Sequence, residues 1–128
     1  MNTLFPYEIK PVSVSDDAVL GADEINALRI IAERIRIEVI DSTFCAKSGH
    51  PGGSLSIADI VAYLYFARMN VSCEQKDDPM RDRFVLSKGH CAPALYAALA
   101  LRGYFPMEEL KFLRKTGNFL HIFGTFGQ

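Results

Sequence analysis

A single short segment of this 128-residue chain has a clear strand pattern, the apolar run RFVLS at residues 83–87. Charged residues and the sequence SKGH bound this run, which predicts a short buried strand from Arg83 to Ser87. Every other strong pattern is helical. One strand cannot form a sheet, because its N–H and C=O groups need partners on a neighbouring strand. The chain is therefore expected to be either a helical domain or part of an α/β domain whose sheet continues in chain that is missing here.

Composition limits the class of protein. The chain is 49% hydrophobic and 23% charged, with 14 basic and 15 acidic residues, which is typical of one globular domain and excludes a disordered chain. The near-zero net charge argues against nucleic acid as a partner, since phosphate neutralisation needs a basic surface.

Location is inferred from three further features. No apolar run is long enough for a transmembrane helix, so no membrane association is expected. The first residues, MNTLFPYEIK, lack the basic and apolar regions of a secretory signal. The three cysteines (Cys45, Cys73 and Cys91) form no CxxC pair and do not suggest a disulfide framework. A cytoplasmic location is the prediction.

The first helix is predicted from about Asp23, as its N-cap, to about residue 46. Five apolar residues follow helical spacing in it: Leu28, Ile31, Ala32, Ile35 and Val39. Residues 34–40, RIRIEVI, also alternate as a strand would, but the longer period favours the helix. Residues 1–21 are interpreted as an extended N-terminal arm.

A loop is predicted at residues 47–56, KSGHPGGSLS, because glycine, proline and serine dominate it. A helix capped by Ser54 or Ser56 is expected to follow at 57–69; it is apolar almost all round, which predicts burial on several sides. Its Tyr63, Tyr65 and Phe66 are assigned to the core.

The second half is predicted to hold a polar surface loop at 70–83, the strand, and two further helices. Pro93 suits the first turn of one helix and Gly103 the position just past its end. Pro106 is expected to open the last helix and Gly117 to stop it. Acidic residues in its first turn (Glu108, Glu109) and basic ones in its last turns (Lys111, Arg114, Lys115) would match the helix dipole.

Two glycine–histidine loops are the best candidates for chemistry. His50 lies in SGHPGG, before a helix, where backbone N–H groups favour anions. Lys88 and His90 lie in SKGH, between the predicted strand and a helix, and would suit a diphosphate. Either loop could instead be a tight turn with a solvated side chain. Two such loops in one small domain favour convergence at one site.

Other candidates are weaker. His121 lies in an apolar stretch and is interpreted as a packed surface residue. A nucleophilic pair of His90 and Cys91 is disfavoured because adjacent side chains rarely face each other, and a zinc site formed by His50, His90, Cys73 and Cys91 lacks paired spacing. Asp77 and Asp78 are assigned to a solvated loop.

Together these motifs carry a family resemblance. ALRIIAERIRIEVID, SGHPGGSLSIADIVAYLYF and RDRFVLSKGHCAPALYAALALRGYF, within residues 22–117, resemble the start of a transketolase, most closely the N-terminal subunit of split transketolases. The resemblance implies a thiamine-diphosphate-binding α/β fold, mostly helical here, with its first strand at 83–87. It implies ketol transfer between sugar phosphates with thiamine diphosphate and magnesium.

The resemblance also implies roles for individual residues. His50 would be catalytic, moving protons on the substrate, and Ser48 would contact the substrate with it. Lys88, Gly89 and His90 would bind the cofactor. No metal ligand is assigned within this chain.

The similarity ends near residue 117. Family members continue with segments like LQGHP, TGSLGQG and GDG, whereas GNFLHIFGTFGQ stands here, with His121 two positions early and Phe123 in place of the histidine. Residues 22–128 are therefore predicted to be an incomplete, truncated thiamine-diphosphate-binding domain without its magnesium ligands. Alone, it is expected to be marginally stable and to bind no cofactor, and an obligate partner such as a C-terminal transketolase subunit is expected. The alternatives are a non-catalytic interaction protein that docks on that subunit, or an inactive remnant.

Overall fold

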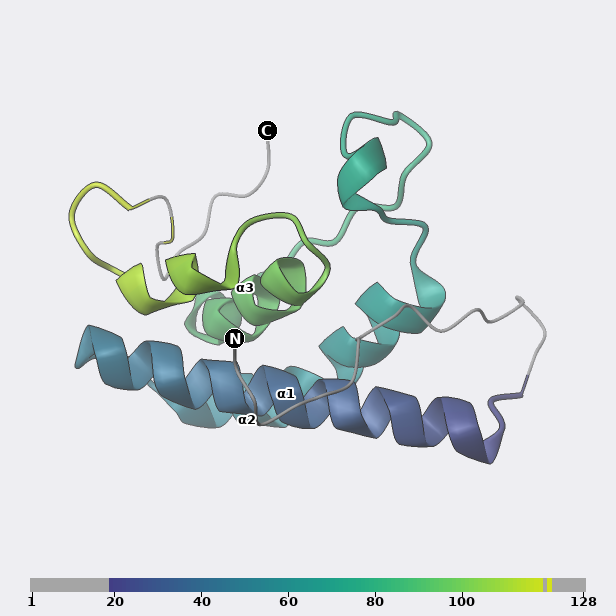
Figure 1. Cartoon of the computed structure of the whole chain (residues 1–128), viewed down its shortest axis with the longest axis horizontal. Helices are drawn as coiled ribbons and strands as arrows, with labels where there is room; N and C mark the ends of the chain where they lie inside the picture. The colour runs from purple at the N-terminus through teal and green to yellow at the C-terminus, as the bar shows by residue number, and fades with distance from the viewer. Residues whose placement is uncertain (1–18, 119, 121–128) are drawn as a thin grey trace.

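The structure is a computed structural model, which describes residues 19–118 and 120 and is mostly helical (Figure 1). The α-helices are α1 (Ala22–Ala46), α2 (Pro51–Tyr63) and α3 (Ala92–Leu101). A π-helical turn, Leu64–Arg68, continues α2. Short 3₁₀ helices follow at Cys73–Gln75, Gly89–Cys91 and Met107–Phe112. Each of the three α-helices packs against the other two, with α1 as the longest element of the bundle.

Helix α1 confirms the predicted period. All five apolar residues named for its stripe are buried and face α2 and α3. Its N-terminus differs from the prediction, because the N-cap is Gly21 and Asp23 lies inside the first turn. The extended Gly21 accepts the first helical bond from the Ile25 N–H at 3.1 Å, while Asp23 and Glu24 face the positive end of the helix dipole.

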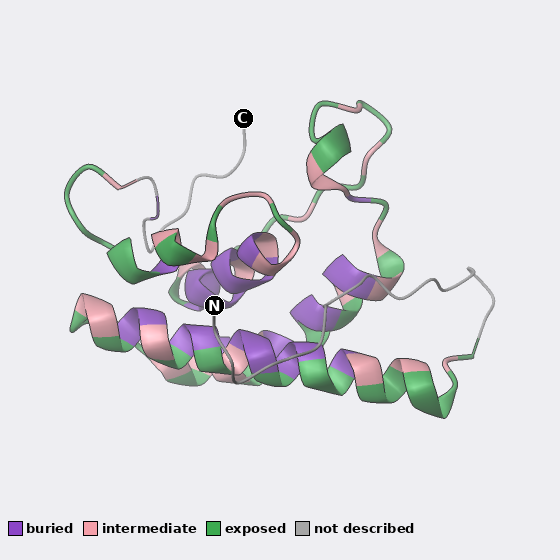
Figure 2. Ribbon diagram, in the orientation of Figure 1, coloured by how far each residue is buried: buried purple, intermediate pink, exposed green. Residues whose placement is uncertain are grey.

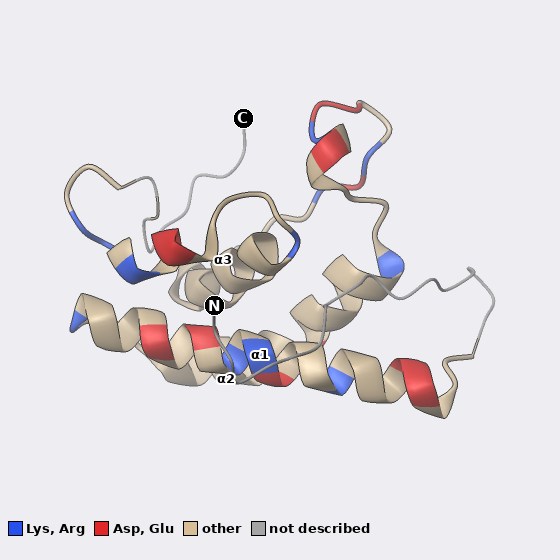
Figure 3. Ribbon diagram, in the orientation of Figure 1, with Lys and Arg blue, Asp and Glu red and all other residues tan. Residues whose placement is uncertain are grey.

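The main core fills the space between the three α-helices (Figure 2). Helix α3 has no charged residue and is tan throughout in Figure 3, which explains why most of its side chains are buried. A second cluster joins α3 to the 3₁₀ helix Met107–Phe112 and the residues after it; its buried members are Ala92, Tyr96, Ala100, Leu110, Leu113 and Leu120.

The predicted loop at 47–56 is wrong after its fourth residue. Helix α2 begins at Pro51, so neither Ser54 nor Ser56 caps it; its N-cap is His50. Proline is well suited to the first helical position, because it has no N–H to satisfy and its φ is already helical. Burial is also less complete than predicted, since Ile60 and Tyr63 are exposed while Tyr65 and Phe66 are buried.

The predicted strand at 83–87 is also wrong for the residues that the structure describes. The segment is extended but pairs with no other described segment, and the side chain of Val85 is 87% exposed rather than buried. Phe84 and Leu86 are half-buried on the opposite side, and the Phe84 ring packs edge-on against Tyr65, with 5.8 Å between centroids. The alternation of a strand is present, but a ladder partner is not within the described part of the chain.

Apart from the strand at 83–87, the second half follows the prediction up to residue 105. Residues 70–83 form a largely exposed loop, Pro93 lies in the first turn of α3, and Gly103 follows the helix at φ 82°. The last helix is shorter than predicted: only Met107–Phe112 is helical, and Arg114 and Lys115 lie beyond it. Arg114 adopts φ 62°, which a continuing helix cannot accommodate.

Parts of the prediction lie outside the described residues. They are residues 1–18 of the proposed N-terminal arm, together with His121 and Phe123. Within the described ranges, no helix combines the length and the apolar character that crossing a membrane requires.

Candidate functional site

The first histidine loop joins α1 to α2 and has a constrained backbone. Lys47 ends α1 in the left-handed region at φ 50°, and the N–H of Ser48 donates to the carbonyl of Thr43 at 3.4 Å. Gly49 has φ 129°, a conformation that a residue with a Cβ rarely adopts. His50 follows in an extended conformation as the N-cap of α2, and its exposed ring makes no capping hydrogen bond. The local sequence thus places His50 at the N-terminus of α2.

The second histidine loop lies immediately before α3. Lys88 precedes the single 3₁₀ turn Gly89–Cys91, which is closed by a hydrogen bond of 2.9 Å from the Cys91 N–H to the Lys88 carbonyl. Cys91 and Ala92 are buried, whereas Lys88 and His90 are exposed. The turn therefore anchors itself through its last residue and presents its polar side chains outward.

The two loops converge, as predicted. The ring centroids of His50 and His90 are 6.0 Å apart and the ring planes are at 89°, an edge-on contact. The pair depends on tertiary packing, because His50 precedes α2 and His90 precedes α3. The arrangement presents two imidazoles, each able to donate or accept a hydrogen bond, on one exposed surface.

A close packing contact between α2 and the second loop brings the histidines together. A Cβ atom on Gly53 would lie 2.9 Å from the Cys91 Sγ and 3.3 Å from the Lys88 Nζ. A side chain at position 53 would force the Cys91 Sγ to shift, so glycine allows the closest approach. The sequence analysis assigned Gly53 only to a loop. The feature that could have identified its role is the presence of a glycine in the first turn of a helix.

The surface around α2's N-terminus has the chemistry of an anion site. The first N–H groups of a helix lack intrahelical acceptors, and here no side chain caps them. The Lys88 ammonium lies against this turn although a cation is disfavoured at a helix N-terminus. The exposed Gly52 has open space where a Cβ would be. These donors fit a diphosphate group.

Ser48, predicted to contact substrate, has a hydrogen-bond partner within the protein. Its Oγ accepts a hydrogen bond from Nη1 of Arg114, a residue that sequence reasoning placed only on a helix. No sequence signal identified this contact, because it joins residues 66 positions apart.

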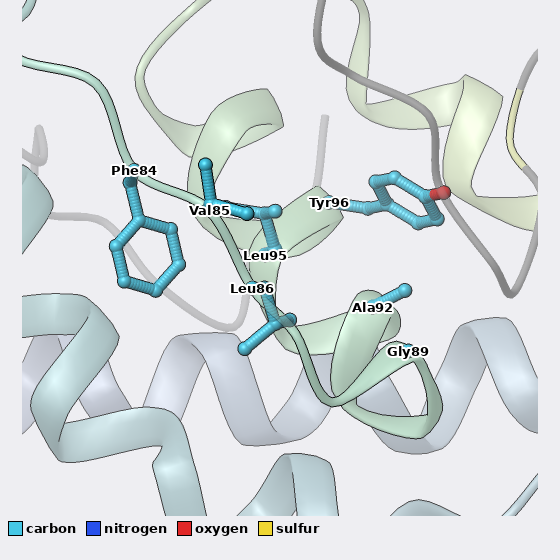
Figure 4. A pocket seen from close by; sticks show the side chains of 7 residues that line it. All are labelled: Phe84, Val85, Leu86, Gly89, Ala92, Leu95 and Tyr96. Atoms are coloured by element: carbon cyan, nitrogen blue, oxygen red, sulfur yellow. The ribbon is translucent and has the colours of Figure 1, made fainter.

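The described residues do not offer a metal site, since no group of three or more His, Cys, Asp or Glu side chains comes together within them. Cys45, Cys73 and Cys91 are free thiols. A shallow pocket of ≈ 60 Å³ (Figure 4) is lined by Phe84, Val85, Leu86, Gly89, Ala92, Leu95 and Tyr96. Its lining contains neither histidine and shares only Gly89 with the candidate site.

Comparison with known proteins decides the family. The family model described as "Transketolase, thiamine diphosphate binding domain" matches residues 17–120, which is most of the chain. This chain belongs to the transketolase family. Both histidine loops of the transketolase domain lie within the matched residues.

Several relatives carry transketolase names. Over 72 residues (56% of this chain and 26% of the relative), the identity is 57% with the 6-deoxy-6-sulfo-D-fructose transketolase subunit SqwG of Clostridium sp. (strain MSTE9). Over 92 residues (72% and 15%), it is 47% with the transketolase of Pongo abelii. Over 97 residues (76% and 34%), it is 36% with one subunit of the apulose-4-phosphate transketolase of Phocaeicola vulgatus. The chain thus spans about a third or less of the length of each relative.

Proposed function

We propose that this chain provides the thiamine-diphosphate-binding portion of a transketolase-type transferase, which moves a two-carbon ketol unit between sugar phosphates. The observation that carries the proposal is the 6.0 Å approach of His50 and His90 beside the cation-lined N-terminus of α2. The family match supports the cofactor. The cofactor, when bound, would supply the carbanion chemistry that ketol transfer requires.

The proposed roles follow from the donors that each residue offers. Lys88, the N–H groups at Gly89 and the His90 imidazole would hold the diphosphate, since each presents a positive charge or a hydrogen-bond donor. His50 would exchange a proton between an imidazole nitrogen and a sugar hydroxyl oxygen. Ser48 would contribute to the substrate side of the same surface.

Magnesium is proposed as the counter-ion of the diphosphate, and no group of three or more His, Cys, Asp or Glu side chains comes together among the described residues to hold it. We therefore expect them to come from the rest of the enzyme. Without this ion the diphosphate lacks its main counter-charge, so the chain alone is expected to bind the cofactor too weakly to measure.

We propose that a protein partner pairs with the exposed, extended segment at 83–87. The side chain of Val85 is exposed, and the backbone of this segment pairs with no other described segment, so it could form a ladder with another strand. Two of the relatives are named as subunits, which supports a multichain enzyme. The partner would be a C-terminal transketolase subunit or the domains that complete this one, in an obligate oligomer. The free cysteines support a cytoplasmic location.

The proposal is tested with a chimera in which residues 17–120 replace the matching segment of a transketolase whose remaining domains are intact. We expect thiamine-diphosphate-dependent ketol transfer, and at least a tenfold loss of kcat/KM in the His50→Gln and His90→Gln variants. Lys88→Ala should weaken cofactor binding, whereas the control Lys76→Ala, in the exposed 70–83 loop, should not. A properly folded chimera that associates with its partner but neither binds the cofactor nor turns over would favour the non-catalytic docking function.

A further inference from the structure

Arg114 is the one residue of the C-terminal part whose side chain reaches the first histidine loop through a hydrogen bond within the described structure. Its Nη1 donates to the Oγ of Ser48, two residues before His50. The described part of the chain places no acidic side chain in an ion pair with Arg114; the pairs there involve Arg34 and Arg36. The guanidinium is therefore directed at the loop rather than neutralised by a carboxylate.

The backbone of Arg114 is held in an unfavourable conformation. A φ of 62° is uncommon for a residue with a Cβ and needs support from its surroundings. That support comes from both sides: the Arg114 N–H donates to the Leu120 carbonyl at 3.1 Å, and Leu113 and Leu120 are buried in the second core cluster. The guanidinium thus extends from a turn that the core fixes in place.

The described structure ties the Ser48 and Gly49 part of this loop back to α1. The Ser48 N–H bonds to the Thr43 carbonyl, and the Cβ position of Gly49 lies 3.2 Å from the Thr43 Cγ2. Both contacts tie the loop back to α1. The Arg114 bond adds a restraint on the Ser48 side chain from a residue far along the chain.

We propose that Arg114 is a positioning residue: by holding Ser48, it keeps the 47–50 loop in the conformation that directs His50 toward His90. Ser48 then links Arg114 to His50, in addition to the substrate contact proposed for it. What the positioned His50 does chemically rests on the proposed function, but the positioning itself does not.

The test measures backbone amide hydrogen exchange of residues 48–50 in the full chain, without ligand. Arg114→Gly removes the guanidinium while keeping a residue that favours positive φ, so the turn should survive. We expect this variant and Ser48→Ala each to speed exchange at 48–50 about three- to tenfold, the range for one lost hydrogen bond. The double variant should exchange no faster than either single one. Lys115→Ala is the matched control, because it removes the neighbouring positive charge without touching Ser48.

Two results would overturn the proposal. The first is the absence of a coupled effect on exchange: either the exchange rates at 48–50 are unchanged in Arg114→Gly, or the rate increases of the two single variants add in the double variant. Both outcomes mean that the Ser48 bond does not restrain the loop. The other is weaker binding of inorganic pyrophosphate in Arg114→Gly but not in Ser48→Ala, with exchange unaffected; Arg114 would then bind anions directly. Because exchange is measured without cofactor or substrate, loss of the proposed function in the chimera would leave this result interpretable.

Discussion

The Sγ atom of Cys91 lies 2.9 Å from the position that a Cβ atom on Gly53 would occupy. This contact brings the turn before α3 against the first turn of α2, so the two histidine loops approach more closely than side chains at both positions would allow. The proximity of His50 and His90 therefore depends on the lack of a side chain at Gly53 in α2 and on the small, buried side chain of Cys91 in the facing turn.

The substitution Gly53→Ala should destabilise the chain by roughly 1–3 kcal/mol, the range for overpacking a tight contact. Alanine's higher helix propensity, worth up to about 1 kcal/mol, offsets part of this loss. The free energy of unfolding is measured by urea denaturation. Gly52→Ala is the control, because open space surrounds the Cβ at that position, and it should be neutral or stabilising. Equal shifts in the two variants would show that the contact with Cys91 has no effect.

Glu38 should make stability depend on pH in an unusual direction. It pairs with Arg34 at 2.6 Å, but burial raises its pKa above the ordinary 4.5, with Asp41 adding and Arg34 and Lys111 opposing. A carboxyl whose pKa is raised by folding favours the native state in its protonated form. Its contribution is therefore full below pH 4.5 and is lost as the pH rises through the folded pKa.

Glu38→Gln tests this pH dependence, because glutamine retains the shape but cannot ionise. The free energy of unfolding of the parent chain, minus that of the variant, should decrease as the pH is raised from about 4 to 7. A difference that increases over this range would mean that the Arg34 pair outweighs desolvation.

Tyr65 should weaken the fold at alkaline pH. Its burial is the main reason that its pKa rises from 10.0 to about 12; Tyr104 adds to the shift and Arg81 opposes it. The neutral phenol is favoured in the native state, so stability should fall between pH 10 and about 12, by up to roughly 3 kcal/mol. Urea unfolding across this range should show a smaller decrease for Tyr65→Phe. Parallel decreases would show that Tyr65 ionises normally in the fold.

The exposed Val85 should matter for association and not for folding. Its side chain is 87% exposed, so Val85→Lys should change the free energy of unfolding by less than about 0.5 kcal/mol. A lysine on an open strand edge disfavours pairing, so binding to a partner transketolase subunit, followed by sedimentation or calorimetry, should weaken. Met80→Lys is the control, since Met80 is 79% exposed but lies outside the extended segment. Equal weakening by both variants would argue against a partner at this edge.

The local patterns were informative where one period persisted. The stripe from Leu28 to Val39 predicted α1 because five apolar residues at helical spacing can be buried together only in a helix. The boundaries of α2 and of the last helix were wrong, because glycine and proline stop or start helices depending on their surroundings. At 83–87 the alternation was correct, but a strand also requires a ladder partner, which no local pattern supplies.

For the candidate site, the sequence by itself determined which chemical groups are available: two histidines and a lysine, each beside glycines that precede a helix. The tertiary structure alone decided that His50 and His90 meet at 6.0 Å, that Gly53 permits this approach, and that Arg114 holds Ser48. The physical reason is that these contacts join residues distant in the chain. Distances between such residues are set by how α1, α2 and α3 pack around a common core, and packing depends on all three helices at once.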